Sequence, residues 1–109
     1  MTTLMLCYAV AGILLILLAI PLYFKKIKPN GLYGFRVKKT RENPETWYLV
    51  NRYHAVWLML TGFLTTLGAV GLFFVPNLTG DQYALICLSV FVGPMIIGLI
   101  MTVRYMKSL

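Results

Sequence analysis

Residues able to form hydrogen bonds recur along one face of a segment in the middle of the chain. They are separated by four, three, four, three and four residues, a spacing that places them on one side of a helix. The members of this polar stripe are Trp47, Asn51, His54, Leu58, Thr61 and Thr65. Four of the six carry an amide, imidazole or hydroxyl group, which needs a partner when it is buried. The stripe predicts a face that packs on residues 28–42 and closes a helical bundle. A compatible alternative is a pocket that opens toward the cytoplasmic leaflet, with Arg36 folded toward it.

The remaining reactive side chains do not assemble into a catalytic pattern. One His, two Cys and three acidic residues are too few and too scattered for a triad or a metal site. The sequence therefore predicts neither an enzyme nor a cofactor. We expect His54, near the edge of an apolar segment, to be a hydrogen-bonded anchor and not a catalyst or haem ligand.

Three long apolar segments must position these residues. Of the 109 residues, 60% are hydrophobic and 12% charged, whereas a soluble domain has about a quarter charged. Residues 4–24, 55–75 and 83–103 each form a run of 21 without a charge. Such a run spans about 31 Å as a helix, which matches a hydrocarbon core of about 30 Å. No ionisable group lies inside these runs, which argues against a self-contained ion-coupled transporter.

The fold predicted is an all-α membrane protein, a small bundle of three transmembrane helices in one domain, residues 1–109. The helices are expected at about 4–24, 44–75 and 82–104, with a basic cytoplasmic loop between the first two. Asn43 is a good N-cap, Pro44 suits the first helical position, and Glu45 favours the positive end of the helix dipole. The second helix would thus begin before the membrane does, as a cytoplasmic extension at headgroup level.

The basic residues predict how the chain is oriented. All ten lie between the first two helices or after the third: Lys25, Lys26, Lys28, Arg36, Lys38, Lys39, Arg41, Arg52, Arg104 and Lys107. The positive-inside rule places these regions in the cytoplasm, and the N-terminus and residues 76–82 outside. The net charge of +7 is thus explained by membrane topology, and no nucleic-acid partner is expected.

Small residues and cysteines offer further packing predictions. Small side chains let helices approach in lipid, and they occur at Ala9, Gly12, Gly62, Thr66, Ala69, Gly93 and Gly98. Cys7 and Cys87 are both expected near the outer face. The favoured interpretation is two buried thiols, and a disulfide remains the alternative.

Two neighbouring stretches resemble a known family. "PNGLYGFRV" followed by "TRENPETWYLVNR" resembles the SdpI family of bacterial membrane proteins. The matching positions, to which the stripe adds His54 as a candidate functional residue, are Asn30, Gly34, Phe35, Arg36, Asn43, Trp47, Asn51 and Arg52. Arg36 follows Gly34, which frees the backbone, and the aromatic pair Tyr33 and Phe35. A guanidinium there can make forked hydrogen bonds or stack on Trp47, which an ammonium group cannot do. We therefore expect Arg36→Lys to impair function and Lys38→Arg to leave it intact.

The resemblance implies a small multi-pass protein of the bacterial cell membrane. Named members of the family protect the producing cell against a secreted hydrophobic peptide toxin, and the best-known member also holds a transcriptional repressor at the membrane. The partners implied are membrane lipids, a peptide toxin and a cytoplasmic repressor, with no catalytic activity or cofactor. The alternative function is a transport or lipid-handling module that works as a homo-oligomer, since three short helices enclose little volume alone.

Overall fold

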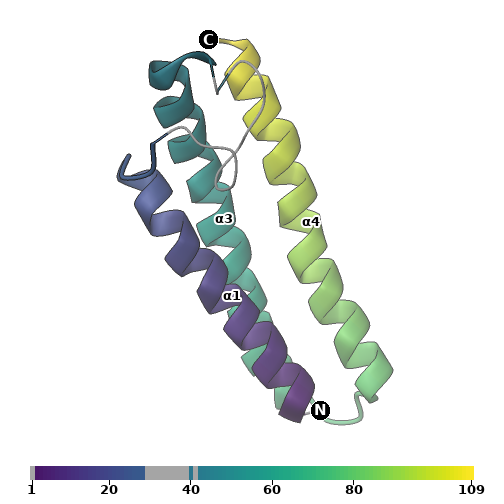
Figure 1. The fold of residues 1–109 in the computed structure, drawn as a ribbon. Helices are drawn as coiled ribbons and strands as arrows, with labels where there is room; N and C mark the ends of the chain where they lie inside the picture. Colours follow the sequence, from purple (N-terminus) through teal and green to yellow (C-terminus); the bar gives the residue numbers. More distant parts are fainter. Residues whose placement is uncertain (1, 29–39, 41) are drawn as a thin grey trace.

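The computed structural model describes residues 2–28, 40 and 42–109, and these form three α-helices and their connections (Figure 1). Helix α1 covers Thr2–Tyr23, α3 covers Pro44–Phe73 and α4 covers Gly80–Lys107. Each is long and apolar enough to cross a membrane. The predicted all-α membrane fold is confirmed. The expected loop lies mostly within residues 29–39 and 41, outside the described part of the chain.

The helix ends follow from local capping. The Asn43 side chain accepts hydrogen bonds from the backbone N–H groups of Glu45 and Thr46, and Pro44 is the first helical residue, as predicted. Helix α3 ends at Phe73, two residues before the expected end at residue 75. Helix α4 begins at Gly80 instead of residue 82, because Thr79 and Gln82 form a capping box that fixes the earlier start.

Two other helix ends extend beyond their predicted limits, whereas α1 ends at Tyr23, one residue before its predicted end. Helix α1 begins at Thr2 instead of residue 4, and α4 continues to Lys107 instead of ending near residue 104. A hydropathy window ends where polar residues begin, but backbone hydrogen bonding continues through them. Arg104 and Lys107 stand in the last turn of α4, where cations interact favourably with the helix dipole.

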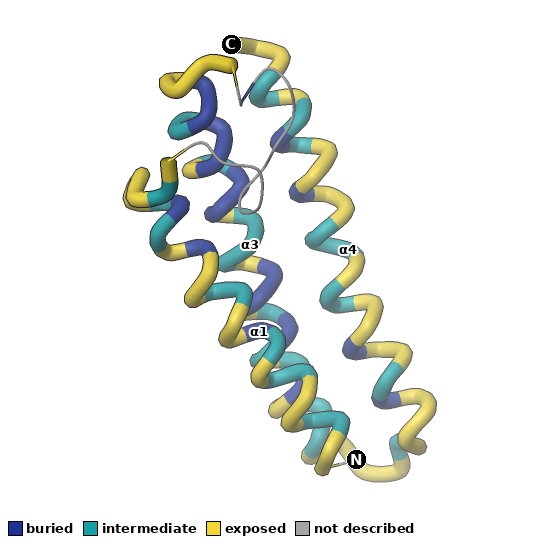
Figure 2. Tube along the Cα trace, in the orientation of Figure 1, coloured by how far each residue is buried: buried dark blue, intermediate teal, exposed yellow. Residues whose placement is uncertain are grey.

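Helix α3 lies between the other two helices, and it carries most of the buried residues (Figures 1 and 2). Gly12 and Gly62 form the crossing of α1 and α3, where a Cβ on either glycine would meet backbone atoms of the other helix. Near this crossing the Thr66 hydroxyl donates to the Ala9 carbonyl at 3.1 Å. Small residues therefore mediate the α1–α3 contact, as the sequence predicted.

Helix α4 contacts α3 through two large side chains set against small ones. Gly98 lies directly against Trp57, and a Cβ there would come within 2.8 Å of the Trp57 Cβ. Toward the other end, the buried Tyr83 donates a hydrogen bond from its hydroxyl to the Ala69 carbonyl. Each of these aromatic side chains thus has a small residue of the partner helix to pack on.

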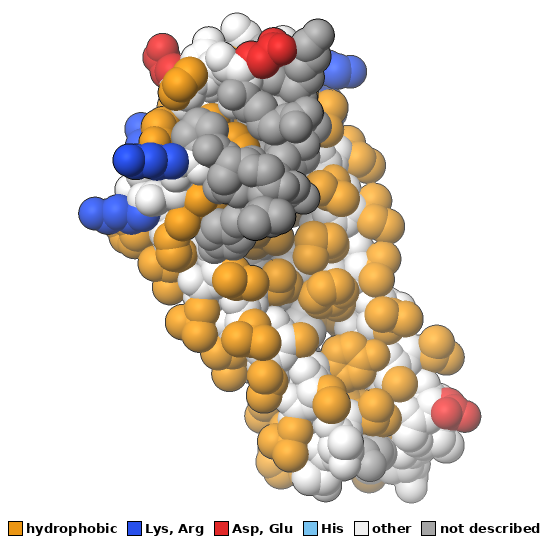
Figure 3. Space-filling model, in the orientation of Figure 1, with side chains coloured by type: hydrophobic (Ala, Val, Ile, Leu, Met, Phe, Trp, Pro, Cys, Tyr) orange, Lys and Arg blue, Asp and Glu red, His pale blue; other side chains and the backbone are white. Residues whose placement is uncertain are grey.

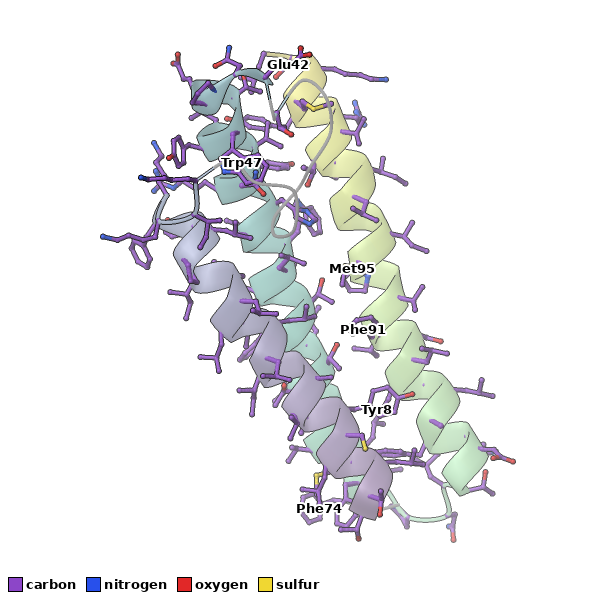
Figure 4. All side chains as sticks on the ribbon, viewed as in Figure 1. Tyr8, Glu42, Trp47, Phe74, Phe91 and Met95 are labelled. Carbon is purple, nitrogen blue, oxygen red and sulfur yellow. The ribbon has the colours of Figure 1, made fainter. Side chains whose placement is uncertain are left out.

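Helices α1 and α4 approach each other near the end of the bundle that holds the N-terminus. The Tyr8 hydroxyl donates to the Ala84 carbonyl there at 3.2 Å. Further along, the Phe91 and Met95 side chains extend from α4 toward the other two helices (Figure 4). Both cysteines are free: Cys87 is buried, but Cys7 is exposed, so the prediction of two buried thiols was wrong for Cys7. Its side chain lies on the outward face of α1, where it belongs to the surface available to lipid.

The outer surface is apolar along most of its length and charged at its ends (Figure 3). Large hydrophobic side chains such as Leu17, Phe63 and Leu85 are more than half exposed. The described Lys and Arg side chains gather at the end that holds the C-terminus, called the basic end below (Figure 3). An apolar belt of this kind is the surface that a bilayer solvates.

Candidate functional site

The polar stripe of α3 is a continuous inner face of the bundle. Five of its six members are buried and Leu58 is half-buried, and the buried ones are Trp47, Asn51, His54, Thr61 and Thr65. The stripe lies on the side of α3 between the faces that contact α1 and α4, because it falls between Gly62 and Trp57 around the helix. The predicted common face on one side of α3 is therefore confirmed, whereas its predicted packing on residues 28–42 falls mostly outside the described residues. The buried polar groups on this face need partners.

Trp47 joins the start of α3 to the chain that follows α1. Its side chain is fully buried, and the indole Nε1–H donates to the Ile27 carbonyl at 2.8 Å. One turn further, the Asn51 Nδ2 donates to the Trp47 carbonyl at 3.0 Å. These bonds hold the two motif residues in fixed orientations at the basic end.

His54 bridges α3 and α4. Its Nδ1 lies 3.1 Å from the Thr102 hydroxyl oxygen, and that hydroxyl lies 2.6 Å from the Gly98 carbonyl. A carbonyl can only accept, so the Thr102 proton points to Gly98 and the hydroxyl oxygen accepts from His54 Nδ1–H. The ring is thereby held as the Nδ1–H tautomer or as the imidazolium. This bond makes His54 an anchor between helices, as expected from its position.

The threonines of the stripe differ in their bonding. The Thr61 hydroxyl donates to the Trp57 carbonyl of its own helix at 2.7 Å. The Thr65 hydroxyl is buried and has no hydrogen-bond partner among the described residues. Burying an unpaired hydroxyl at membrane depth costs free energy. Thr65 is therefore the position on the described stripe where a ligand or a neighbouring chain could supply a missing hydrogen bond.

Two motif residues do not join the stripe. Asn43 is exposed and caps α3, accepting from Glu45 N at 3.0 Å and Thr46 N at 3.4 Å. Arg52 is exposed on another side of α3, where its guanidinium stacks on Tyr23 with 4.6 Å between Cζ and the ring centroid. The structure thus gathers Trp47, Asn51 and His54 and separates Asn43 and Arg52 from them.

The other candidate residues, Asn30, Gly34, Phe35 and Arg36, lie outside the described residues, and so does the predicted pocket around Arg36. In the described part of the chain, no group of three or more His, Cys, Asp or Glu is arranged to hold a metal ion.

Sequence reasoning missed the partners of the motif residues. Thr102 was not singled out, although it contacts His54, and neither was Tyr23, which contacts Arg52. Thr40 is fully buried and was assigned only to the loop. The uncharged runs end at residues 55 and 103 on the basic side, and aligning these ends would have placed Thr102 near the depth of His54. The choice among equally deep residues still required the tertiary structure.

Comparison with protein families gives a match to the model of the SdpI/YfhL protein family over residues 26–105. This range includes α3, nearly all of α4 and every candidate motif residue. The chain belongs to the SdpI/YfhL protein family. The family resemblance identified from the motif is therefore confirmed, and it is independent of α1, all of which precedes the matched range. Neither the curated proteins nor the solved structures contain a match to the chain.

Proposed function

We propose that this member of the SdpI/YfhL family is an immunity or sensor protein that protects a bacterial cell against a membrane-active peptide toxin. Support comes from family membership together with three helices able to span a membrane. The observation that carries the proposal is the set of hydrogen bonds made by Trp47, Asn51 and His54 at one end of the bundle. Trp47 bonds the chain that follows α1, Asn51 bonds Trp47 within α3, and His54 bonds α4. A toxin that displaces one helix would disturb these bonds.

The surface that meets the peptide must be a helix face that is not already packed. The small residues Gly12 and Gly62 do not qualify, because α1 and α3 bury them against each other. On α4, Ser89 and Gly93 are four residues apart and line a shallow hollow of about 360 Å³ together with Leu88 and Val92. A Cβ on Gly93 would meet no atom within 4 Å. Two small residues spaced by four let another helix approach closely in lipid, so we place the toxin on this face.

A survival assay tests the immunity proposal. Cells sensitive to a panel of membrane-active peptides would express the chain, and we expect survival to rise for at least one peptide. Gly93→Leu should reduce protection, because the leucine fills the hollow without clashing inside the bundle. Leu17→Ile, on an exposed part of α1, is the matched control. Unchanged killing by every peptide at confirmed membrane levels would refute the proposal.

The cellular setting is part of the same proposal. The protein would lie in the bacterial cytoplasmic membrane with its basic end and C-terminus inside, where a cytoplasmic repressor could bind after toxin is sensed. No catalytic activity or cofactor enters this mechanism. Arg36→Lys and Lys38→Arg, compared at equal membrane levels in the survival assay, test whether the motif arginine acts beyond its charge.

The α4 hollow also favours a second candidate function, an oligomeric transport or lipid-handling module. The Ser89 and Gly93 face could contact a second copy of the chain instead of a toxin, and an oligomer could enclose a path that one bundle cannot. Oligomeric state in detergent, together with solute flux in liposomes, distinguishes the two functions. A monomer without flux removes this candidate.

A further inference from the structure

A groove built by all three helices lies at the basic end, on a different side of α3 from the polar stripe. Its volume is about 270 Å³. It is lined by Tyr23, Leu49, Arg52, Tyr53, Val56 and Tyr105. Three tyrosines and an arginine over aliphatic side chains make a surface with a polar rim and an apolar floor. Tyrosines at this level are typical of the boundary between headgroups and hydrocarbon.

Arg52 supplies the charge of the groove. One guanidinium nitrogen donates to the Tyr23 hydroxyl at 3.3 Å, while the ring of the same tyrosine lies beneath Cζ at 4.6 Å. Among the described residues, no carboxylate pairs with this guanidinium. A guanidinium has five N–H donors, so several remain for a ligand after the bond to Tyr23. Its planar donor pattern fits the oxygens of a phosphate.

The opposite wall is aromatic and rigid. The Tyr53 and Tyr105 rings are stacked, with centroids 4.5 Å apart and planes 12° from parallel. This stack joins α3 to α4, as the Arg52 contact joins α3 to α1. Each wall is therefore fixed by a contact between helices, and the groove between them is formed before any ligand binds.

An apolar track leads out of the groove toward the membrane centre. Val56, Leu60 and Phe63 follow one another at spacings of four and three on one face of α3. Their side chains are 48%, 42% and 56% exposed, so no other helix covers the track. A ligand that fills both features needs an anionic head and a long hydrocarbon chain.

We propose that this groove binds one anionic phospholipid, with its phosphate on Arg52 and an acyl chain along Val56, Leu60 and Phe63. The charge of Arg52, which no described carboxylate neutralises, favours an anionic over a zwitterionic lipid. The apolar track favours a lipid over free phosphate. The binding site is separate from the α4 hollow, so the proposal does not depend on toxin immunity.

Native mass spectrometry of the purified chain in detergent tests the site. The protein would be titrated with phosphatidylglycerol or phosphatidylcholine. We expect Arg52→Gln to weaken the first phosphatidylglycerol-binding event roughly tenfold, because charge-assisted phosphate bonds are lost. Lys26→Gln removes the same charge at an exposed position that does not line the groove, and we expect only about a twofold effect. Equal losses in both variants, or equal affinity for the two lipids, would overturn the proposal.

A second pair of variants leaves the charge intact. Val56→Trp should block the apolar floor and reduce phosphatidylglycerol binding, whereas Leu17→Trp on the exposed side of α1 should not. Glycerol phosphate provides the control for a free anion and should fail to displace the lipid. Displacement by glycerol phosphate, or normal lipid binding by Val56→Trp with preserved helix content, would also overturn the proposal.

Discussion

The Trp47 indole lies fully buried at the basic end, where a single hydrogen bond joins it to the chain after α1. No other natural side chain combines an indole ring with an N–H donor, so the side chain at this position both fills the space and makes the bond. Asn43, by contrast, acts on its own helix by capping it. Two residues of the same motif thus have different physical roles: Trp47 links two segments of the chain, and Asn43 caps its own helix.

Trp47→Phe should lower the free energy of unfolding by about 1–2 kcal/mol, because the Ile27 carbonyl loses its donor and a smaller ring fills the space. Tyr48→Phe, at the adjacent and only half-buried position, is the control and should have little effect. Reversible unfolding in mixed micelles, followed by circular dichroism, measures both. Equal stability of Trp47→Phe and the parent would contradict the structural role of the indole bond.

Two threonines on the inner side of the bundle should respond oppositely to the same substitution. Thr102→Val leaves His54 Nδ1–H without its acceptor and should cost about 0.5–1.5 kcal/mol. Thr65→Val removes a buried hydroxyl that has no described partner, and it should stabilise the chain by about 0.5–1 kcal/mol. The same unfolding experiment applies. A loss of survival in a stable Thr65→Val variant would show that this hydroxyl serves a ligand.

At the scale of helices, the crossing of α1 and α3 depends on the absence of two side chains. Gly12 and Gly62 bring the two backbones together, and neither glycine is needed for a turn or an unusual φ. Their close approach replaces the hydrophobic driving force that is missing between helices in lipid. The α3–α4 contact instead pairs a large aromatic side chain on one helix with a small residue on the other: Trp57 with Gly98, and Tyr83 with Ala69.

Gly12→Ala should destabilise the bundle by about 1–3 kcal/mol, since its methyl group would collide with the Gly62 carbonyl and force α1 away from α3. Gly93→Ala is the matched control in another helix, where the added methyl meets no atom within 4 Å and should change stability by less than about 0.5 kcal/mol. Unfolding in micelles and cross-linking between α1 and α3 would both report the difference. Similar stability of the two variants would refute the tight crossing.

At the scale of the whole molecule, charge is distributed along the long axis. The described basic side chains lie at one end, and the connection between α3 and α4 lies at the other (Figures 1 and 3). This arrangement is what the positive-inside rule requires of a three-helix protein, and it also places the Arg52 groove at one membrane surface.

Cysteine labelling in intact cells tests the orientation. In a chain with Cys7 and Cys87 replaced by Ala, a cysteine at Asn77 should react with a membrane-impermeant reagent from outside. A cysteine at Lys38 should react only after permeabilisation, because the positive-inside rule predicts that the basic side lies in the cytoplasm. The reverse labelling pattern would place the basic end outside and overturn both the orientation and the proposed cytoplasmic partner.

Sequence alone determined the features that depend on neighbouring residues in the chain. Hydropathy and length identified three spans, Asn43 and Pro44 identified the start of α3, and the spacing from Trp47 to Thr65 identified a common face. These inferences succeeded because helix geometry fixes which residues share a side, whatever surrounds them.

Only the tertiary structure decided which surface meets which. It placed α3 between the other helices, paired His54 with Thr102, turned Arg52 toward Tyr23, and left Cys7 exposed. Each of these outcomes depends on the rotation and crossing of helices about one another. In lipid that geometry follows from the close fit of small and large side chains between different helices, and hydropathy along one segment does not contain it.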